Sequence, residues 1–461
     1  MRQKKRSPLT VLTVLLCVVL LGGAAVLLWK ALPQKKAPDT VSTIETNAVF
    51  ENDNSSTVAP EREQVYEGEL PNTEPAPAPE ETPSDTPSEE APSGEPEDPA
   101  LLAAKKLASD TLATMTAEEK IWQLFFVTPE SLTGYPKVTE AGLATKEAIG
   151  YKPVGGLIYF AQNLEDKAQV QKMLSGVQSF STIPLFLGVD EEGGTVSRVG
   201  ENAELGGKNI GDMASYGEQG DPAALYNAMS DVADMLTELG FNLDFAPVAD
   251  VSGGRSDNVI GSRSFGTDPE LCASMVSVAL GALQDGGVVS CLKHFPGYGS
   301  AVTDDHYGTS VLNKTEEELE ACDYLPFRSG IESGAAFIMV SHLSVPSVTG
   351  DETPADLSEA IVTEILRNKL GFENVIITDA QNMGSITEHY TAAEAAVGAL
   401  MAGADMVLMP ADLQAAYNGV RDALKNGTLT QARIDESVLR ILTVKARFGI
   451  LTEVPQTDDK D

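Results

Sequence analysis

Residues 288–299 read Val-Val-Ser-Cys-Leu-Lys-His-Phe-Pro-Gly-Tyr-Gly. A short apolar run, Val288–Leu292, leads into the polar pair Lys293 and His294, and a Pro-Gly-x-Gly turn follows. This pattern is typical of a buried strand that ends where polar side chains meet solvent. We therefore expect Lys293 and His294 to lie at the carboxyl end of a buried strand.

Seven more apolar runs of this kind occur between residues 101 and 409, and helical patterns separate most of them. The predicted strands are Leu124–Val127, Val154–Phe160, Pro184–Val189, Asn242–Ala246, Val288–Leu292, Ala336–Ser341, Val375–Thr378 and Asp405–Met409. The predicted helices include Pro222–Leu239, Pro269–Gln284, Glu359–Leu370 and Ala392–Ala402. Buried strands that alternate with helices predict an α/β fold, here a single (β/α)8 barrel of the TIM type. A doubly wound open sheet is the alternative, because the number of strands alone does not close a barrel.

The formal net charge of −36 is distributed unevenly over the chain. Residues 1–36 carry +7, residues 37–100 carry −16 and residues 101–461 carry −27. A chain this acidic argues against nucleic acid as a partner.

Residues 1–32 are predicted to be a basic tip followed by a transmembrane helix. Leu9–Trp29 is an uncharged run of 21 residues, and about 30 Å of helix is enough to cross a bilayer. The basic end then stays in the cytoplasm, which places the catalytic domain outside a single-pass cell membrane anchor. A cleaved signal peptide, followed by secretion, is the competing interpretation, for which Gly22–Ala25 offers a weak cleavage site.

Residues 33–100 are predicted to be a disordered linker. Eleven prolines fall between Pro38 and Pro99, among Glu, Ser, Thr and Ala. Such a segment buries too little apolar area to offset the entropy lost on ordering, and its prolines and like charges keep it extended. The catalytic domain is then expected over residues 101–454, with a polar tail at residues 455–461.

Polar residues follow four of the predicted strands directly. They are Asp190, the pair Lys293 and His294, His342 and Asp379. In a barrel of this type the active site is built at the carboxyl ends of the strands. One such aspartate alone is more often a helix cap, but four strand ends together predict an active site.

Four phrases of the sequence resemble the β-N-acetylhexosaminidase branch of glycoside hydrolase family 3, and the resemblance extends over residues 110–450. The phrases are Gly188-Val189-Asp190-Glu191-Glu192-Gly193-Gly194-x-Val196-x-Arg198, Arg263-Ser264-Phe265-Gly266, Lys293-His294-Phe295-Pro296-Gly297-x-Gly299 with Asp304-x-His306, and Val375-Ile376-Ile377-Thr378-Asp379. Taken jointly, they are highly specific.

The resemblance implies a role for each matched position. Asp379 falls on the family's nucleophile, and His306, paired with Asp304 on the loop after the fifth strand, falls on its general acid/base. The positions that hold the sugar hydroxyls and the N-acetyl group match Asp190, Arg198, Arg263, Lys293 and His294. The implied activity is retaining cleavage of terminal β-linked N-acetylglucosamine, with muropeptide-type peptidoglycan fragments as the expected substrate.

The chemistry of these residues suits that activity. Retention needs a carboxylate that attacks the anomeric carbon and a proton donor for the leaving oxygen. Asp379 at the end of a rigid strand suits the nucleophile, because attack demands accurate placement. A histidine can replace the usual acid if it is charged, and Asp304 would orient His306 and raise its pKa. By spacing alone, a solvated turn explains Asp304-Asp305-His306 equally well.

The sequence departs from the family pattern at two places. Tyr298 stands where many relatives have His, and Ala380-Gln381 replaces the Asp-Leu that often follows the nucleophile. The second departure alters the surroundings of the nucleophile and therefore its expected pKa. His342 and His389 are interpreted as mostly structural.

Two other functions compete with the glycosidase. A metal-dependent barrel hydrolase would use His294, His306, His342 and Asp379, but an early His-x-His is missing. No ligand set at metal spacing accompanies Glu191-Glu192 either, so we expect neither metal nor cofactor. A non-catalytic barrel that binds cell-wall glycans is the third possibility, and the intact Asp379 and His306 argue against it.

Overall fold

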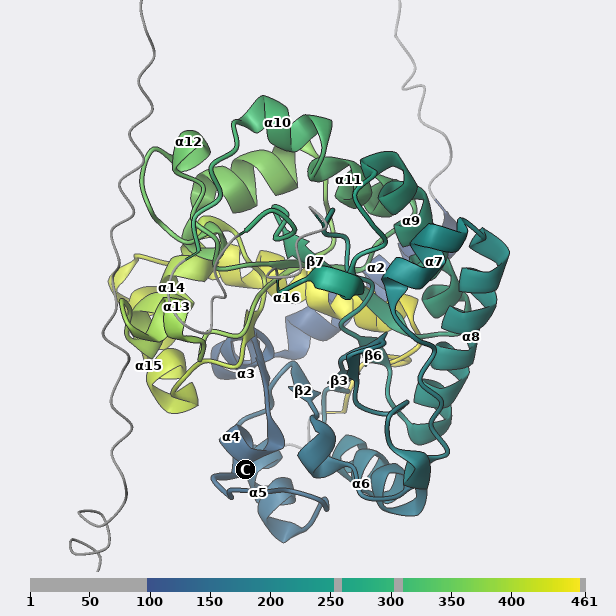
Figure 1. Cartoon of the computed structure of the whole chain (residues 1–461). Coiled ribbons are helices and arrows are strands. Elements are labelled where there is room, and N and C mark those ends of the chain that lie inside the picture. The colour runs from purple at the N-terminus through teal and green to yellow at the C-terminus, as the bar shows by residue number, and fades with distance from the viewer. Residues whose placement is uncertain (1–97, 253–258, 302–309, 457–461) are drawn as a thin grey trace, which may run out of the picture. The chain divides into compact units, whose positions relative to one another are not determined.

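The structure is a computed structural model that describes residues 98–252, 259–301 and 310–456. A parallel eight-stranded sheet lies at its centre, with helices around it (Figure 1). The strands are β1 (Phe125–Val127), β2 (Gly156–Ile158), β3 (Phe186–Val189), β6 (Leu243–Asp244), β7 (Val289–Phe295), β8 (Phe337–Val340), β9 (Val375–Thr378) and β10 (Val407–Leu408). Seven of the predicted strands contain one of them, and the eighth, Val288–Leu292, overlaps β7, which continues to Phe295. This agreement confirms the α/β prediction.

The order of the strands is that of a closing ring. Neighbours follow the order β10-β1-β2-β3-β6-β7-β8-β9, and every pair is parallel. A further parallel bridge between Ile377 and Met406 joins β9 to the start of β10, the two ends of this order. The arrangement is consistent with the predicted (β/α)8 barrel rather than with an open sheet.

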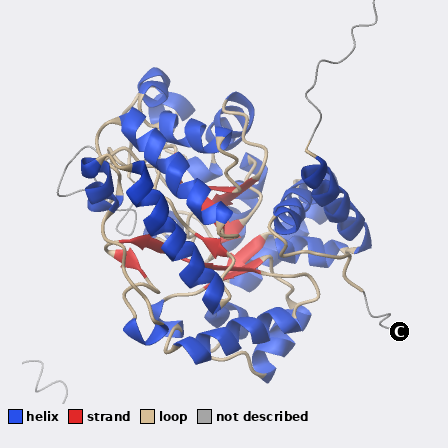
Figure 2. Cartoon of the chain, turned by 90° about the vertical axis from the view of Figure 1, so that its right-hand side faces the viewer, coloured by secondary structure: helices blue, strands red, loops and turns tan. Residues whose placement is uncertain are grey.

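Helices cover the outside of the sheet, as Figure 2 shows. They are α2 (Pro99–Thr114), α3 (Ala117–Gln123), α4 (Pro129–Thr133), α5 (Leu143–Tyr151), α6 (Lys167–Phe180), α7 (Met213–Gln219), α8 (Pro222–Leu239), α9 (Pro269–Asp285), α10 (Glu316–Ala321), α11 (Tyr324–Glu332), α12 (Pro346–Thr349), α13 (Gly384–Thr387), α14 (Ala392–Ala402), α15 (Leu413–Asn426) and α16 (Gln431–Arg447). The segment η6 (Ala360–Lys369) is a π-helix, and short 3-10 turns include η3 (Gly261–Arg263) and η5 (Ala355–Leu357). A small antiparallel hairpin, β4 (Glu191–Gly193) with β5 (Val196–Ser197), follows β3.

The start and stop signals of the sequence explain the helix bounds. In α8 the Asp221 side chain accepts hydrogen bonds from the amides of Ala223 and Ala224, and Pro222 occupies the first turn, where its missing N–H costs nothing. Gly240 ends the helix with a φ of 99°, a left-handed conformation that favours glycine. The predicted helix Pro222–Leu239 therefore has the observed bounds.

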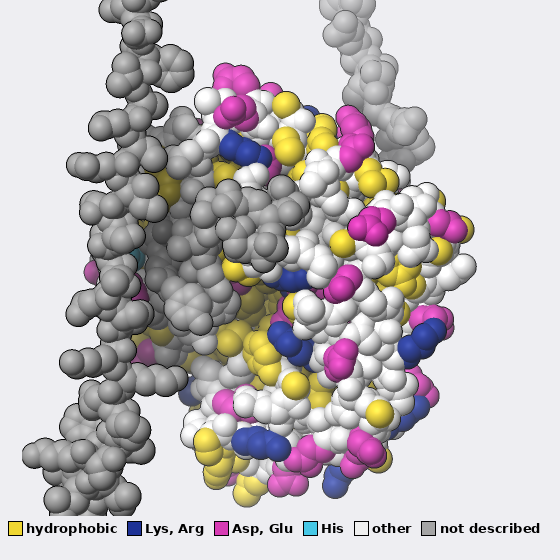
Figure 3. Space-filling model, viewed as in Figure 1, with side chains coloured by type: hydrophobic (Ala, Val, Ile, Leu, Met, Phe, Trp, Pro, Cys, Tyr) yellow, Lys and Arg dark blue, Asp and Glu magenta, His cyan; other side chains and the backbone are white. Residues whose placement is uncertain are grey.

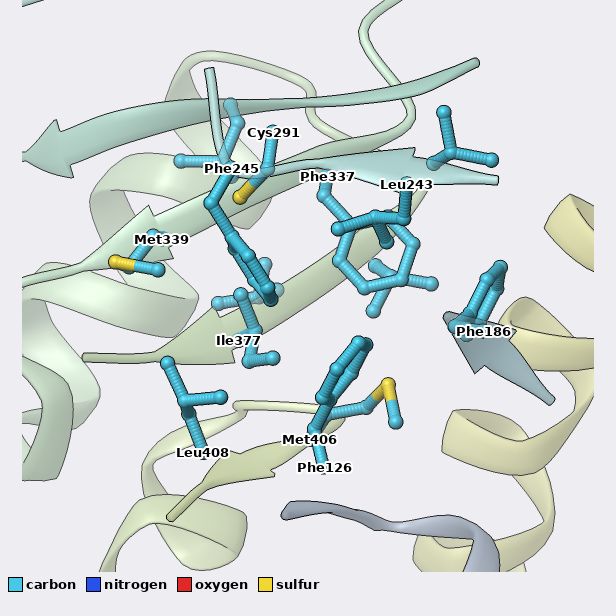
Figure 4. Packing of buried hydrophobic residues seen from close by; sticks show 14 of the residues in the cluster. Phe126, Phe186, Leu243, Phe245, Cys291, Phe337, Met339, Ile377, Met406 and Leu408 are labelled. Atoms are coloured by element: carbon cyan, nitrogen blue, oxygen red, sulfur yellow. The ribbon is translucent and has the colours of Figure 1, made fainter. Parts of the chain in front are cut away.

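The interior of the sheet is filled with apolar side chains from the strands (Figure 4). Phe126 packs edge-on against Phe245 with ring centroids 5.2 Å apart, and Phe186 against Phe337 at 5.1 Å. These aromatic rings come from four different parts of the ring of strands, so they tie opposite sides of the sheet together. The filled interior leaves the strand ends as the place for a site.

The predicted membrane anchor and linker lie outside the described residues. Within residues 98–252, 259–301 and 310–456, no helix is long and apolar enough to cross a membrane. The first described helix, α2, packs against α16 near the other end of the chain. On the face drawn in Figure 3, Asp and Glu side chains are spread over the described surface and interspersed with Lys and Arg.

Candidate active site

A cavity of about 610 Å³ opens at the carboxyl ends of the strands. Six of the predicted site residues line it: Asp190, Arg198, Arg263, Lys293, His294 and Asp379. The other two, Asp304 and His306, lie outside the described residues. The structure thus brings together every described residue that the sequence assigned to the site.

Strand β7 presents two consecutive side chains to this cavity. Successive residues of a regular strand point to opposite faces, yet Lys293 and His294 both line the cavity. The pairing register of β7 with β8 shifts between Leu292 and Phe295, where the strand departs from regular geometry. This irregularity explains how a Lys-His pair can serve one site.

Lys293 lies at the centre of a buried network of charges. Its Nζ lies 2.8 Å from Asp190 Oδ1 and 2.6 Å from Glu192 Oε1. Arg263, at the end of η3, donates from Nε and Nη2 to the two oxygens of Glu192, at 2.7 and 2.8 Å. The network fixes two cationic side chains beside the cavity.

The pKa shifts in this network have opposing causes. Burial alone would raise the pKa of Glu192, but the charges of Lys293 and Arg263 hold it well below its usual range. Burial alone would lower the pKa of Lys293, but Asp190 and Glu192 raise it overall. Lys293 and Glu192 are therefore both charged at neutral pH.

His294 is oriented by a buried carboxylate. Its Nδ1 lies 2.7 Å from Asp250 Oδ2, and Asp250 also accepts the backbone amide of Tyr298 at 2.6 Å. Because the carboxylate can only accept, Nδ1 carries a proton, and Nε2 is the ring nitrogen that a ligand can reach. Asp250 thus holds both the imidazole and the turn that follows β7.

Asp379 follows β9 directly and is fixed by the backbone. Its amide donates to Val340 O at 2.8 Å, and its Oδ1 accepts the amide of Ala380 at 2.7 Å. Burial alone would raise the pKa of Asp379, but the charges of His294 and His342 and the Ala380 amide lower it overall. The result is an ionised carboxylate at a rigid strand end.

The rest of the cavity combines one cation with an apolar wall. The Nε of Arg198 is buried and has no hydrogen-bond partner among the described residues, although the side chain lines the cavity. Phe160, Met339, Met383 and Met409 contribute apolar surface. A cavity lined by both polar groups and apolar surface suits a sugar ring, which has both kinds of face.

Two residues of this site were missed by the sequence predictions. Glu192 was considered only as a cation ligand together with Glu191. Glu192 in fact faces the cavity, whereas Glu191 accepts hydrogen bonds from Ser197 in β5 and from Val199 and Gly200 beyond the hairpin. Successive residues of a strand point to opposite faces, and this two-residue period indicates that Glu191 and Glu192 face different ways. Asp250 stands after a predicted strand, like the other site residues, but six positions beyond Asp244.

The acidic side chains that the structure describes beside the site include no set of metal ligands. In the described parts of the chain, no group of three or more His, Cys, Asp or Glu side chains is arranged to hold a metal ion. Asp244 is fully buried, and burial raises its pKa well above the usual range. Burial thus favours the protonated form of Asp244.

A family model matches most of this domain. The glycosyl hydrolase family 3 N terminal domain model covers residues 116–444. The chain belongs to glycosyl hydrolase family 3. This family membership, which the sequence phrases predicted, is confirmed.

Several named proteins are similar to this chain over most of the described domain. The chain is 32% identical over 330 residues to beta-hexosaminidase A from Pseudoalteromonas piscicida, a match that covers 66% of this chain and 55% of that protein. It is 34% identical over 271 residues to beta-hexosaminidase LpqI from Mycobacterium tuberculosis, covering 57% and 68% respectively. The solved family 3 beta-N-acetylglucosaminidase from Paenibacillus sp. has a TM-score of 0.68 and 32% identity, covering 75% of this chain and 65% of that one. The chain thus spans little more than half of the first of these relatives and just under two thirds of the last.

Proposed function

We propose that this chain is a retaining β-N-acetylhexosaminidase that removes terminal β-linked N-acetylglucosamine. The observation that carries this proposal is Asp379, an ionised carboxylate at a strand end that faces a cavity with cationic side chains. The similarity to proteins named beta-hexosaminidase and beta-N-acetylglucosaminidase supports the sugar class.

The proposed reaction has two steps. Asp379 attacks the anomeric carbon while the glycosidic bond breaks, and His306 gives its proton to the departing oxygen. Water then attacks the same carbon, its proton passes to His306, and the Asp379 carboxylate leaves. Asp304 is proposed to orient His306 and to favour its charged form.

The charged network is proposed to hold the sugar. Lys293 and Arg263 are fixed by Glu192, so their remaining N–H groups can donate to sugar hydroxyls with little loss of side-chain entropy. Arg198 has a buried donor that is not satisfied by the described residues, and a hydroxyl or acetamido oxygen would satisfy it. These contacts bind the substrate and the transition state alike.

The test is hydrolysis of an aryl β-N-acetylglucosaminide beside the matching aryl β-glucoside. We expect turnover of the first and much weaker turnover of the second, with no loss of activity after treatment with a chelator. Asp379→Asn should keep binding and lose turnover. Binding of the sugar without turnover by the wild type would favour the glycan-binding alternative, and inactivation by the chelator would favour the metal-dependent one.

Location and natural substrate are a separate proposal. The uncharged run Leu9–Trp29 after a basic tip supports a membrane anchor, and an acidic, proline-rich segment after it supports a spacer. An enzyme held outside the membrane would meet muropeptide-type fragments of peptidoglycan. Fractionation of cells tests this, since loss of Leu9–Trp29 should move the protein out of the membrane fraction.

A further inference from the structure

The imidazole of His342 is enclosed by acceptors on both sides. It follows β8 and its side chain is fully buried. Nε2 lies 3.1 Å from the carbonyl oxygen of Ala380, and Nδ1 lies 3.0 Å from Asp356 Oδ1. The contact between Nδ1 and Asp356 Oδ1 is close enough for an ion pair, but the two atoms do not form a hydrogen bond with each other. The Ala380 carbonyl oxygen can only accept a hydrogen bond, so Nε2 carries a proton. If Nδ1 carried no proton, its lone pair would face the negative charge of the Asp356 carboxylate.

The surroundings of His342 therefore favour the imidazolium. Burial alone would lower the pKa of His342, but Asp356 and Asp379 raise it to about 9. Among the described residues, the titratable groups that act on Asp379 are Lys293 and His294 from β7 and His342, which follows β8. His342 is thus a cation beside the buried Asp356 carboxylate, and its charge also acts on Asp379.

His342 reaches the nucleophile through one residue. The Ala380 carbonyl is held by His342, and the Ala380 amide donates to Asp379 Oδ1 at 2.7 Å. Ala380 is therefore fixed at both its ends, and the orientation of the Asp379 carboxylate is fixed with it.

The residue after Ala380 completes the arrangement. The amide of Gln381 donates to Leu408 O at 2.9 Å, and its side-chain Nε2 donates to Asp356 Oδ2 at 3.3 Å. Asp356, from η5, is fully buried and also lies near Tyr390, whose pKa it raises together with burial. Ala380 and Gln381, which depart from the family pattern, belong to the segment that follows the nucleophile. Through the Gln381 side chain this segment is joined to Asp356, the carboxylate that faces His342.

We propose that His342, held between Asp356 and the Ala380 carbonyl, is a positioning residue that keeps the Asp379 carboxylate ionised and aimed at the cavity. This role rests on the proposed function, in which Asp379 is the nucleophile. It differs from a packing role because it depends on the charge of the ring. From the sequence alone, His342 was interpreted as mostly structural, and the proposal gives it a role at the nucleophile instead.

The kinetic test uses His342→Gln, whose amide can still donate to the Ala380 carbonyl but carries no charge. The acid limb of the kcat/KM profile reports ionisation of Asp379, and it should move to higher pH by about one unit, since a lost opposite charge raises a carboxyl pKa by one unit or more. At pH values below both acid limbs kcat/KM should fall about tenfold at a given pH, and well above them this shift should change it little. Asp356→Asn should move the limb in the same direction by less.

Lys445→Met serves as the control, because it removes a buried cation that does not line the cavity. It should change the stability and leave the acid limb in place. An unchanged acid limb in His342→Gln, with a loss of activity no greater than the loss of folded protein, would overturn the positioning role.

A measurement without substrate separates this role from the proposed function. The chain has four histidines, so a ¹⁵N-histidine spectrum can be assigned from single substitutions. The His342 ring should stay doubly protonated up to a pH of about 9, and it should lose its proton at a clearly lower pH in Asp356→Asn, where the main group that raises its pKa is gone. A neutral His342 ring at pH 7 in the wild type would overturn the role whatever the enzyme hydrolyses. A protonated ring in an enzyme that hydrolyses no β-N-acetylglucosaminide would refute only the proposed function.

Discussion

The ammonium of Lys293 lies 2.6 Å from the carboxylate of Glu192, and the two side chains are 4% and 1% exposed. A buried ion pair of this kind adds little stability over an apolar pair, but removal of one partner leaves an unpaired buried charge. Glu192 therefore acts mainly by fixing the two cations, Lys293 and Arg263, beside the cavity.

We predict that Glu192→Gln lowers the free energy of unfolding by about 3 kcal/mol at pH 7. It should also raise KM to a similar extent for activated and unactivated leaving groups. Glu165→Gln is the control, since Glu165 pairs with Lys137 on the surface, where such a pair is worth little. The pKa of Glu192 is lowered in the folded protein, so its contribution to the free energy of unfolding is present above about pH 4.3 and is lost as the pH falls further. Equal stability of the two variants at pH 7 would contradict this account.

We predict that Lys445 makes the stability rise with pH. Lys445 is fully buried against the Phe186 ring and the Gln123 amide oxygen, and burial lowers its pKa to about 7. In the unfolded chain Lys445 keeps its proton up to about pH 10.4. The cost in stability of burying its charge is therefore full below pH 7 and is relieved between pH 7 and 10. Thermal unfolding at several pH values should show this rise in the wild type and not in Lys445→Met. Lys425→Met, at an exposed position, should behave as the wild type, and parallel curves for all three proteins would refute the prediction.

The pattern of buried runs was enough to predict the positions of the strands, since all eight lie where apolar residues cluster. It was also enough to predict that Asp190, Lys293, His294 and Asp379 meet, because parallel strands end at one side of the sheet. The two-residue period could show that Glu191 and Glu192 face different ways, but not that Glu192 is the one that faces the cavity, since that depends on the pairing of a short hairpin.

The pairing of His342 with Asp356 could not be predicted either. Asp356 lies in the 3-10 turn η5, and only the path of the loop after β8 brings it to the imidazole. Periodicity carries no information about such loop paths. The assignment of Asp304 and His306 rests on the sequence alone, because both lie outside the described residues.

We predict that His306→Ala slows substrates with poor leaving groups by roughly 10²–10⁴, the usual contribution of general acid catalysis. Activated aryl substrates should be slowed much less, because their leaving oxygen needs no proton. Asp304→Ala should show the same selectivity in weaker form. Rates measured over a series of aryl leaving groups test this, and equal losses along the series would remove His306 from the proton-donor role.

We predict that a chain beginning at Asp98 folds cooperatively and keeps full activity. Asp98 caps α2, and α2 buries Ala104, Ala108 and Thr111 and packs against α16. A chain beginning at Ala117 lacks this contact and should unfold at a lower temperature. Circular dichroism during heating measures both. An insoluble product from Asp98 onward, beside a soluble full chain, would show that the preceding segment belongs to the domain.

The central claim is that Asp379 is the nucleophile of a retaining enzyme. A 2-acetamido sugar that carries fluorine at C5 and a good leaving group forms the covalent intermediate faster than water releases it. Peptide mass spectrometry after a short incubation should locate the sugar on Asp379 in the wild type, and on no residue in Asp379→Asn. A label on Glu191, Glu192 or Asp244, or steady turnover of the substrate by Asp379→Asn, would contradict the account.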